Sequence, residues 1–209
     1  CSDGTLVGWG SNYYSQLGIH GVGYSIVPVV VDASSETSAL AGKSITAISS
    51  GENHSLALCS DGTVVAWGKN DKGQLGNNST TESSVPTAVN REPGLSALAG
   101  KTVIAIRAGN NHNIALINDG IVAAWGGNEV GQLGDQSRTQ FLIPTLVNKE
   151  EGGSALFNRE VSRLSEGSNG SHNLVIYGTK PTEIEVEVLE PSIASLVSNG
   201  STVDFGSAV

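Results

Sequence analysis

The chain has 209 residues, with 11 lysines and arginines against 20 aspartates and glutamates, and its formal net charge is −9. This acidic balance argues against nucleic-acid binding, which depends on clustered basic side chains that displace counterions from phosphates. No stretch approaches the about 20 consecutive apolar residues that a membrane-spanning helix needs, so we expect no membrane insertion in this segment. The chain starts at Cys1 and contains no methionine, which indicates a piece of a longer protein.

A repeat of 58 residues dominates the sequence. All three tryptophans follow one another at this spacing, as do two histidines, and a third histidine comes 60 residues later. An aspartate, a glutamine and a proline recur at the same step. So many coincident positions at one period indicate a repeated structural unit. The positions are Trp9, Trp67 and Trp125; His54, His112 and His172; Asp3, Asp61 and Asp119; Gln16, Gln74 and Gln132; Pro28, Pro86 and Pro144.

Each complete unit predicts four short strands. In the first complete unit they are expected at residues 44–49, 54–59, 63–68 and 85–90. Asp61-Gly62, between the second and third strands, supplies the positive φ of a two-residue hairpin turn. Pro86 suits an outer edge strand, because proline has no N–H to donate to a neighbour. Four antiparallel strands of this length are typical of one blade of a β-propeller.

Two complete units lie between two incomplete ones along the chain. Residues 1–31 supply only a third and a fourth strand, and residues 161–177 supply only a first and a second. Residues 44–90 and 102–147 supply complete sets. The fold class is therefore all-β, with about three blades' worth of strands.

One segment carries a family resemblance. The pattern from His54 to Gly76, HSLALCSDGTVVAWGKNDKGQLG, resembles the regulator of chromosome condensation repeat, in the form found in bacterial extracellular proteins. The resemblance covers residues 1–178 and implies a partial array from a propeller of seven blades. It implies an extracellular or cell-surface location. We expect further blades upstream and the end of the array near Gly178.

The tail, residues 179–209, is expected to be a linker followed by the start of a β-sandwich. Residues 184–188 alternate strictly between apolar and acidic side chains, which is typical of a half-buried strand. The tail is similar to the opening of an abnormal-spindle/hydin-type immunoglobulin-like domain.

The repeated side chains are expected to hold the blades together. Packing between blades is favoured for the tryptophans over a light-sensing or ligand-stacking array. The histidines suggest a metal cluster, but zinc needs ligands about 2.1 Å from one centre, and equivalent positions on facing sheets lie on the order of 10 Å apart. We therefore expect structural imidazoles that hydrogen-bond the backbone. These structural positions are Trp9, Trp67, Trp125, His54, His112, His172, Gly76 and Gly134.

The two cysteines are expected to be free core residues. Cys1 and Cys59 occupy the same repeat position, where the next unit has Ile117. A position shared by cysteine and isoleucine is apolar, and equivalent positions on different blades lie too far apart for a disulfide.

The loops on one face of the repeat are the candidate binding surface. The loops from first to second strand and from third to fourth strand emerge on the same face, and their tips vary while the scaffold repeats. Exposed tyrosines make the best anchors; the alternative is that these tips are simply solvated. The candidates are Tyr13, Tyr14, Glu52, Asn53, Asp71, Lys72, Asn110, Asn111, Glu129 and Val130.

These observations favour a binding protein over an enzyme. No Ser/His/Asp or Cys/His arrangement is indicated, so we expect no catalytic residues, cofactor or metal. The predicted function is a non-catalytic protein-interaction scaffold with a protein partner. The alternatives are a guanine-nucleotide exchange factor for a small GTPase, as in the eukaryotic namesake of the repeat, and a glycan-acting propeller enzyme.

Overall fold

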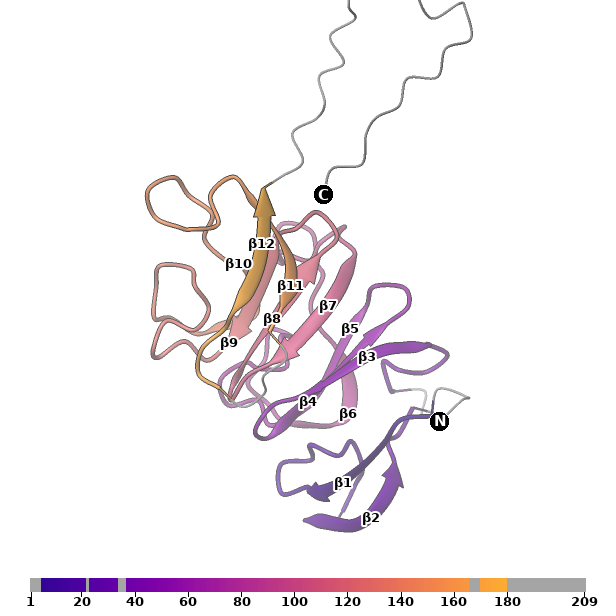
Figure 1. Cartoon of the computed structure of the whole chain (residues 1–209). Helices are drawn as coiled ribbons and strands as arrows, with labels where there is room; N and C mark the ends of the chain where they lie inside the picture. Colours follow the sequence, from indigo (N-terminus) through magenta and orange to yellow (C-terminus); the bar gives the residue numbers. More distant parts are fainter. Residues whose placement is uncertain (1–4, 22, 34–36, 166–169, 180–209) are drawn as a thin grey trace, which may run out of the picture. The chain divides into compact units, whose positions relative to one another are not determined.

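The computed structural model describes residues 5–21, 23–33, 37–165 and 170–179 (Figure 1). The chain divides into two compact units, Cys1–Gly178 and Thr179–Val209. All regular elements of the described part are β-strands, which confirms the expected all-β class. Apart from Thr179, the expected linker and immunoglobulin-like segment lies outside the described residues and stays a prediction.

Two four-stranded antiparallel sheets form the two complete blades of the first unit. Each sheet keeps its strands in chain order, so each strand pairs with the one before and the one after it. The first blade contains β3 (Ile45–Ser50), β4 (His54–Cys59), β5 (Val64–Gly68) and β6 (Ser83–Ala88). The second blade contains β7 (Val103–Ala108), β8 (His112–Ile117), β9 (Val122–Gly126) and β10 (Phe141–Leu146).

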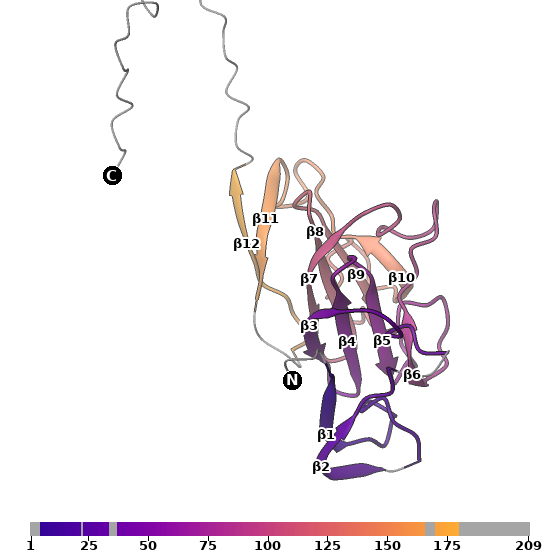
Figure 2. The ribbon, with the colours of Figure 1, turned by 90° about the vertical axis from the view of Figure 1, so that its right-hand side faces the viewer.

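Two-stranded sheets lie before and after the complete blades, as Figures 1 and 2 show. The leading half-blade consists of β1 (Val7–Ser11) and β2 (Tyr24–Val30), and the trailing half-blade consists of β11 (Arg159–Leu164) and β12 (Val175–Thr179). The leading half-blade has the third and fourth strands of the repeat, and the trailing half-blade has the first and second. The described twelve strands therefore make about three blades' worth, as expected. The full number of blades stays a prediction.

The outer strand of the first complete blade begins earlier than the sequence pattern indicates. In the first blade it was expected at residues 85–90, but β6 spans Ser83–Ala88. Ser83 pairs with Gly68 beyond an irregularity in the register between Ala66 and Gly68. A β-bulge of this kind lets the outer strand follow a twisted neighbour, and apolar alternation alone does not reveal it.

The central strands of each blade are buried on both faces. β5 and β9 are buried along their whole length because each lies between neighbouring strands and is covered by adjoining sheets. Between the two complete blades, Leu56 and Leu58 pack with Ile106 and Ile117 in one hydrophobic cluster. Cys59 is a buried free thiol, whereas Cys1 lies outside the described residues.

Gly68, at the end of β5, shows why the repeat needs glycine after each tryptophan. Its φ is +103°, a backbone conformation that side chains other than glycine rarely adopt. A Cβ atom there would lie 2.7 Å from the carbonyl oxygen of Asn53 and 2.8 Å from the Cα atom of His54. Glycine therefore lets the turn between β3 and β4 approach the start of the long loop after β5.

Candidate functional site

A repeated asparagine organises the long loop between β5 and β6. The Oδ1 atom of Asn70 accepts a hydrogen bond from the backbone N–H of Leu75 at 2.9 Å. Its Nδ2 atom donates to the carbonyl oxygens of Ser79 and Thr81, each at 2.9 Å. Asn70 is fully buried, so one side chain fixes both arms of the loop from inside.

A glutamine four residues later fixes the tip of the same loop. The Oε1 atom of Gln74 accepts from the backbone N–H of Lys72 at 2.9 Å. The candidate pair Asp71 and Lys72 therefore lies between two anchoring side chains, Asn70 and Gln74. The tip is held in one conformation before any partner arrives.

Equivalent side chains fix the loops after β1 and β9. Asn12 and Asn128 accept from the backbone N–H groups of Leu17 and Leu133, each at 2.9 Å. Gln16 and Gln132 accept from the backbone N–H groups of Tyr14 at 2.9 Å and Val130 at 3.0 Å. The sequence interpretation did not single out these asparagines, although Asn12, Asn70 and Asn128 follow the same 58-residue spacing.

The backbone carbonyl of each glutamine also ties its loop to the next sheet. The carbonyl oxygen of Gln74 accepts from the indole Nε1 of Trp125 at 3.1 Å and from Nδ2 of Asn113 at 2.7 Å. The carbonyl oxygen of Gln16 accepts from Nε1 of Trp67 at 2.9 Å and from the hydroxyl of Ser55 at 2.8 Å. The same glutamine residues therefore fix the loop tips through their side chains and join neighbouring sheets through their carbonyl groups.

The repeated histidines join neighbouring sheets through side chains. Asn113 donates through Nδ2, so its Oδ1 atom accepts from Nε2 of His54, at 2.7 Å. His112 and Asn173 make the equivalent contact at 2.9 Å. We expected backbone partners, and the partners found are amides of the next sheet. Burial lowers the pKa of His54 to about 4 and also lowers the pKa of His112, so both imidazoles are neutral at pH 7.

His172, the third member of this series, is exposed. His54 begins β4 and His112 begins β8, whereas His172 lies in the turn before β12. In the described ranges no three His, Cys, Asp or Glu side chains form a group that could hold a metal ion.

Apolar and charged side chains occupy the loop tips. Tyr13 is 73% exposed, and Tyr14 and Val130 are exposed as well. The ammonium group of Lys69 lies 5.0 Å from the centre of the Tyr14 ring, which links the leading half-blade to the first complete blade. Lys72 and Glu129 form an ion pair of 2.7 Å between the two complete blades. The hydrogen bond from Lys72 lowers the pKa of Glu129.

The shorter turns between first and second strands adjoin these tips. The backbone N–H of Lys69 donates to the carbonyl oxygen of Asn53 at 2.8 Å, so both kinds of loop share one end of the blade. The backbone N–H of Glu52 donates to the carbonyl oxygen of Asn110 at 3.2 Å, which joins neighbouring turns. Glu52 is exposed, whereas Asn53, Asn110 and Asn111 are half-buried.

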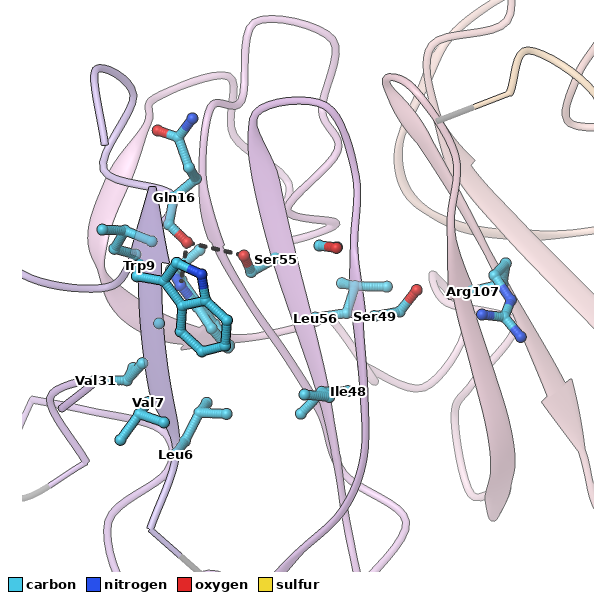
Figure 3. Close-up of a pocket in the computed structure, with 14 residues that line it drawn as sticks. Leu6, Val7, Trp9, Gln16, Val31, Ile48, Ser49, Ser55, Leu56 and Arg107 are labelled. Carbon is cyan, nitrogen blue, oxygen red and sulfur yellow. Dashed lines mark hydrogen bonds between the residues drawn. The ribbon is translucent and has the colours of Figure 1, made fainter. Parts of the chain in front are cut away.

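Trp9 differs from the other two tryptophans. Trp67 and Trp125 are buried between sheets, but Trp9 is 64% exposed. Trp67 and Trp125 each donate to a glutamine carbonyl of the preceding sheet, and the described residues contain no sheet before β1, so the packing of Trp9 between blades stays a prediction. Trp9 lines a cavity of about 390 Å³, to whose lining Gln16 and Ile48 also contribute (Figure 3).

Gly76 and Gly134 occupy equivalent loop positions with different surroundings. Gly76 is buried, and a Cβ atom there would lie 2.7 Å from Nε1 of Trp125. Gly134 is exposed, and a Cβ atom there would meet only Val147, at 3.2 Å. Gly76 therefore packs closely against the indole of Trp125, whereas no indole lies against Gly134 among the described residues.

Comparison with known protein families gives a match over most of the repeat region. A family model described as the regulator of chromosome condensation (RCC1) repeat matches residues 3–58 and 61–116. A second model of the same description matches residues 45–74 and 103–132. Together these matches cover more than half of the chain.

Several curated proteins are similar in sequence. The human (Homo sapiens) E3 ubiquitin-protein ligase HERC2 is 34% identical over 179 residues, which are 86% of this chain and 3% of HERC2. Protein pim1 of Schizosaccharomyces pombe is 32% identical over 187 residues, covering 82% of this chain and 32% of pim1. The ultraviolet-B receptor UVR8 of Arabidopsis thaliana is 32% identical over 144 residues, covering 69% of this chain and 30% of UVR8. The chain spans less than a third of the length of each.

Solved structures show the same fold. The crystal structure of human WBSCR16 superimposes with a TM-score of 0.66 at 26% identity, over 86% of this chain and 41% of that protein. Prp20p of Saccharomyces cerevisiae superimposes with a TM-score of 0.67 at 22% identity, over 87% of this chain and 41% of Prp20p. The four-stranded units are therefore propeller blades.

The expected extracellular or cell-surface location is wrong. The similar proteins named above, HERC2, pim1 and UVR8, are eukaryotic intracellular proteins. The residues from His54 to Gly76 are those that the packing of a blade requires. Blades pack in the same way inside and outside the cell, so this pattern does not indicate where the protein is located. Among the residues that the structure describes, none belongs to a helix with the length and apolar character needed to span a bilayer.

Proposed function

This chain belongs to the regulator of chromosome condensation (RCC1) repeat family, and from that premise we propose that it is a non-catalytic protein-interaction scaffold. It binds a protein partner through the loop tips on the face that carries Tyr13, Asp71 and Glu129. These tips are defined here as the binding face, with the full set Tyr13, Tyr14, Glu52, Asn53, Asp71, Lys72, Asn110, Asn111, Glu129 and Val130.

The observation that carries the proposal is the fixed presentation of variable residues. In each long loop two variable positions lie between an asparagine and a glutamine whose side chains bond the loop backbone. The variable pairs are Tyr13-Tyr14, Asp71-Lys72 and Glu129-Val130. Binding to a preorganised surface loses little conformational entropy, so such tips suit recognition.

The chemistry of the binding face indicates the kind of partner. Tyr13 offers a large, rigid ring at low entropic cost, and Val130 adds apolar area. Glu52, Asp71 and Glu129 carry three negative charges against the single positive charge of Lys72 among the ten residues. We propose a partner that meets the tyrosines with an apolar patch and surrounds it with basic side chains.

The experiment compares two matched variants of the whole chain in capture assays followed by quantitative mass spectrometry. The double variant Tyr13→Ala and Tyr14→Ala removes the proposed anchors. Leu146→Ala removes an exposed apolar side chain of the outer strand β10, away from the loop tips. Partners retained by the Leu146 variant and lost by the tyrosine variant support the binding face. Equal retention by both variants would refute it.

The alternative function is guanine-nucleotide exchange on a small GTPase. The name of the Prp20p structure reports binding to Gsp1p and histones, but Prp20p is 22% identical to this chain and supports the fold alone. No contact among the described residues favours this activity over simple binding. Acceleration of nucleotide release from a small GTPase such as Gsp1p by the purified chain would place exchange ahead of scaffolding.

A further inference from the structure

Two hairpin turns with the sequence Asp-Gly lie at the end of the complete blades opposite to the binding face. Asp61-Gly62 joins β4 to β5, and Asp119-Gly120 joins β8 to β9. β4 begins beside the binding face at His54 and ends at Cys59, so the turn that follows it lies at the far end of the blade. The proposed binding function uses neither turn.

An aspartate followed by glycine can rearrange its own backbone. Glycine has no side chain, so its backbone nitrogen can approach the carboxyl carbon of the preceding aspartate. When the nitrogen attacks the protonated carboxyl group, an N–Cγ bond forms, and the carboxyl hydroxyl leaves as water with the amide proton. The product is a five-membered succinimide ring.

Water then reopens the ring at one of its two carbonyl carbons. Opening at Cγ restores aspartate. Opening at the main-chain carbonyl carbon gives isoaspartate, in which the backbone runs through Cβ and Cγ. The water that was lost is regained, so the rearrangement needs no oxidant, reductant or further reactant.

The folded turns restrain the nitrogen that would attack. The backbone N–H of Gly62 donates to the carbonyl oxygen of Cys59 at 2.9 Å. The backbone N–H of Gly120 donates to the carbonyl oxygen of Ile117 at 3.0 Å. Each nitrogen has to lose this hydrogen bond before it can react.

A lysine of the same blade restrains the carboxyl group of Asp61. The ammonium group of Lys43 forms an ion pair with Oδ2 of Asp61, and Oδ1 accepts from the backbone N–H of Thr63 at 2.9 Å. The Lys43 ammonium also donates to the hydroxyl of Thr63, at 3.3 Å. The hydrogen bond from Lys43 lowers the pKa of Asp61. The carboxyl group therefore stays ionised and has no hydroxyl to lose.

The second complete blade repeats this arrangement 58 residues later. The ammonium group of Lys101 lies 2.7 Å from Oδ2 of Asp119. The backbone N–H of Ile121 donates to Oδ1 of Asp119 at 3.2 Å. Ile121 has no hydroxyl, so the lysine and one backbone N–H are enough to hold both carboxyl oxygens.

We propose that Asp61 and Asp119 are two latent sites of isoaspartate formation, and that Lys43 and Lys101 are the positioning residues that keep them unreacted. Without the ammonium group of its blade, the carboxyl group is free to turn toward the glycine nitrogen and to take up a proton. Each ion pair lies within one blade, so loss of one lysine exposes one turn and leaves the other protected.

Isoaspartate in a turn changes the contact with the next blade. The isomer adds one atom to the backbone of the turn. The carbonyl oxygen of Gly62 accepts from Nη1 of Arg91 at 3.3 Å, and that of Gly120 accepts from the backbone N–H of Val161 at 3.0 Å. These two bonds join each turn to the segments that follow its blade, so isomerisation should also lower the thermal stability of the chain.

The test incubates the whole chain at neutral pH for several weeks and counts isoaspartate at each turn. Peptide mass spectrometry locates the isomer, and enzymatic methylation of isoaspartyl carboxyl groups measures its total amount. The variants are Lys43→Gln and Lys101→Gln, in which an uncharged side chain replaces a partly exposed lysine, so the fold is kept. Each variant contains the unchanged turn of the other blade as its internal control. Lys43→Arg is the conservative variant that retains a cation.

We expect Lys43→Gln to raise the rate at Asp61 about two- to fivefold, as for loss of one exposed ion pair, and to leave Asp119 unchanged. Lys101→Gln should do the reverse. Lys43→Arg should keep Asp61 at the rate of the unmodified chain. In denaturant both turns should react faster and equally in all variants, because the restraining hydrogen bonds are absent from the unfolded chain.

Three results would overturn the proposal. One is an unchanged rate at Asp61 in Lys43→Gln. The second is isomerisation in the folded unmodified chain as fast as in denaturant. The third is an equal rise at both turns in either variant, which would indicate general loosening of the fold and not protection by one lysine. The turns do not belong to the binding face, so these outcomes are independent of the partner-capture experiment.

Discussion

The carbonyl oxygen of Gln74 in the first complete blade accepts the indole N–H of Trp125 in the second, at 3.1 Å. Because the side chain of the same glutamine fixes the loop tip at Lys72, the contact couples the stability of the blade junction to the shape of the binding face. Changes at buried junction residues are therefore expected to alter recognition without contact with the partner.

The first prediction separates the hydrogen bond of Trp125 from its packing. Trp125→Phe removes the indole N–H and should lower the free energy of unfolding by about 1 kcal/mol. Trp125→Ala also leaves a cavity and should lower it by about 3–5 kcal/mol. Denaturant unfolding curves measure both. Trp9→Phe is the control, since Trp9 is exposed and should change the free energy by less than about 0.5 kcal/mol. Equal losses at the two tryptophans would contradict this assignment.

The second prediction concerns the buried asparagine of the loop. Asn70→Ala leaves the N–H of Leu75 and the carbonyl groups of Ser79 and Thr81 without their partner. The expected cost is about 1–3 kcal/mol of unfolding free energy, with weaker capture of the partner. Thr80→Ala, at an exposed position in the same loop, should leave both quantities unchanged. Full stability of the Asn70 variant would show that the loop does not depend on this side chain.

The third prediction compares two glycines with the same backbone conformation. Gly10 has φ +102° and Gly68 has φ +103°. A Cβ atom at Gly10 would have no neighbour within 4 Å, whereas one at Gly68 would approach Asn53 and His54 closely. Gly10→Ala should therefore cost about 1–3 kcal/mol for backbone strain alone, and Gly68→Ala clearly more. Thermal unfolding of the pair gives the difference, and similar costs would show that the turn moves aside.

The fourth prediction is a loss of stability below neutral pH. The pKa of His54 falls from 6.5 to about 4 on folding because burial disfavours the charged imidazole. Between these pH values the unfolded chain binds more protons than the folded chain, so stability decreases as the pH falls through this window. The contribution of His54 amounts to roughly 3 kcal/mol by pH 4.

His54→Gln tests this pH dependence, because glutamine does not titrate and its amide N–H can donate to Asn113. The free energy of unfolding of this variant should vary less between pH 6.5 and 4 than that of the unmodified chain. His112 contributes in the same direction in both proteins, because burial lowers its pKa too. Parallel pH profiles for the two proteins would contradict a neutral, buried His54.

The period of the sequence determined the strands, their order and the division into two complete and two incomplete blades. Alternation, hairpin turns and Pro86 are local signals, so each unit could be predicted without its neighbours. The same period carries Asn12, Asn70 and Asn128, although their role as loop anchors appears only when their hydrogen bonds are seen. The repeat pattern did not determine the cellular location of the protein, because its residues are those that blade packing requires in any compartment.

Only the tertiary structure decided what each copy of a repeated residue does. Trp9 and Trp125 are equivalent in the sequence, but one is exposed and the other is buried, because burial depends on whether a neighbouring strand and carbonyl group are present. For the same reason the partner of His54 is an amide 59 residues away and not its own backbone. A repeat in the sequence determines which strands and side chains each blade contains. The contacts between blades depend on distances in space, which the spacing of residues along the chain does not give.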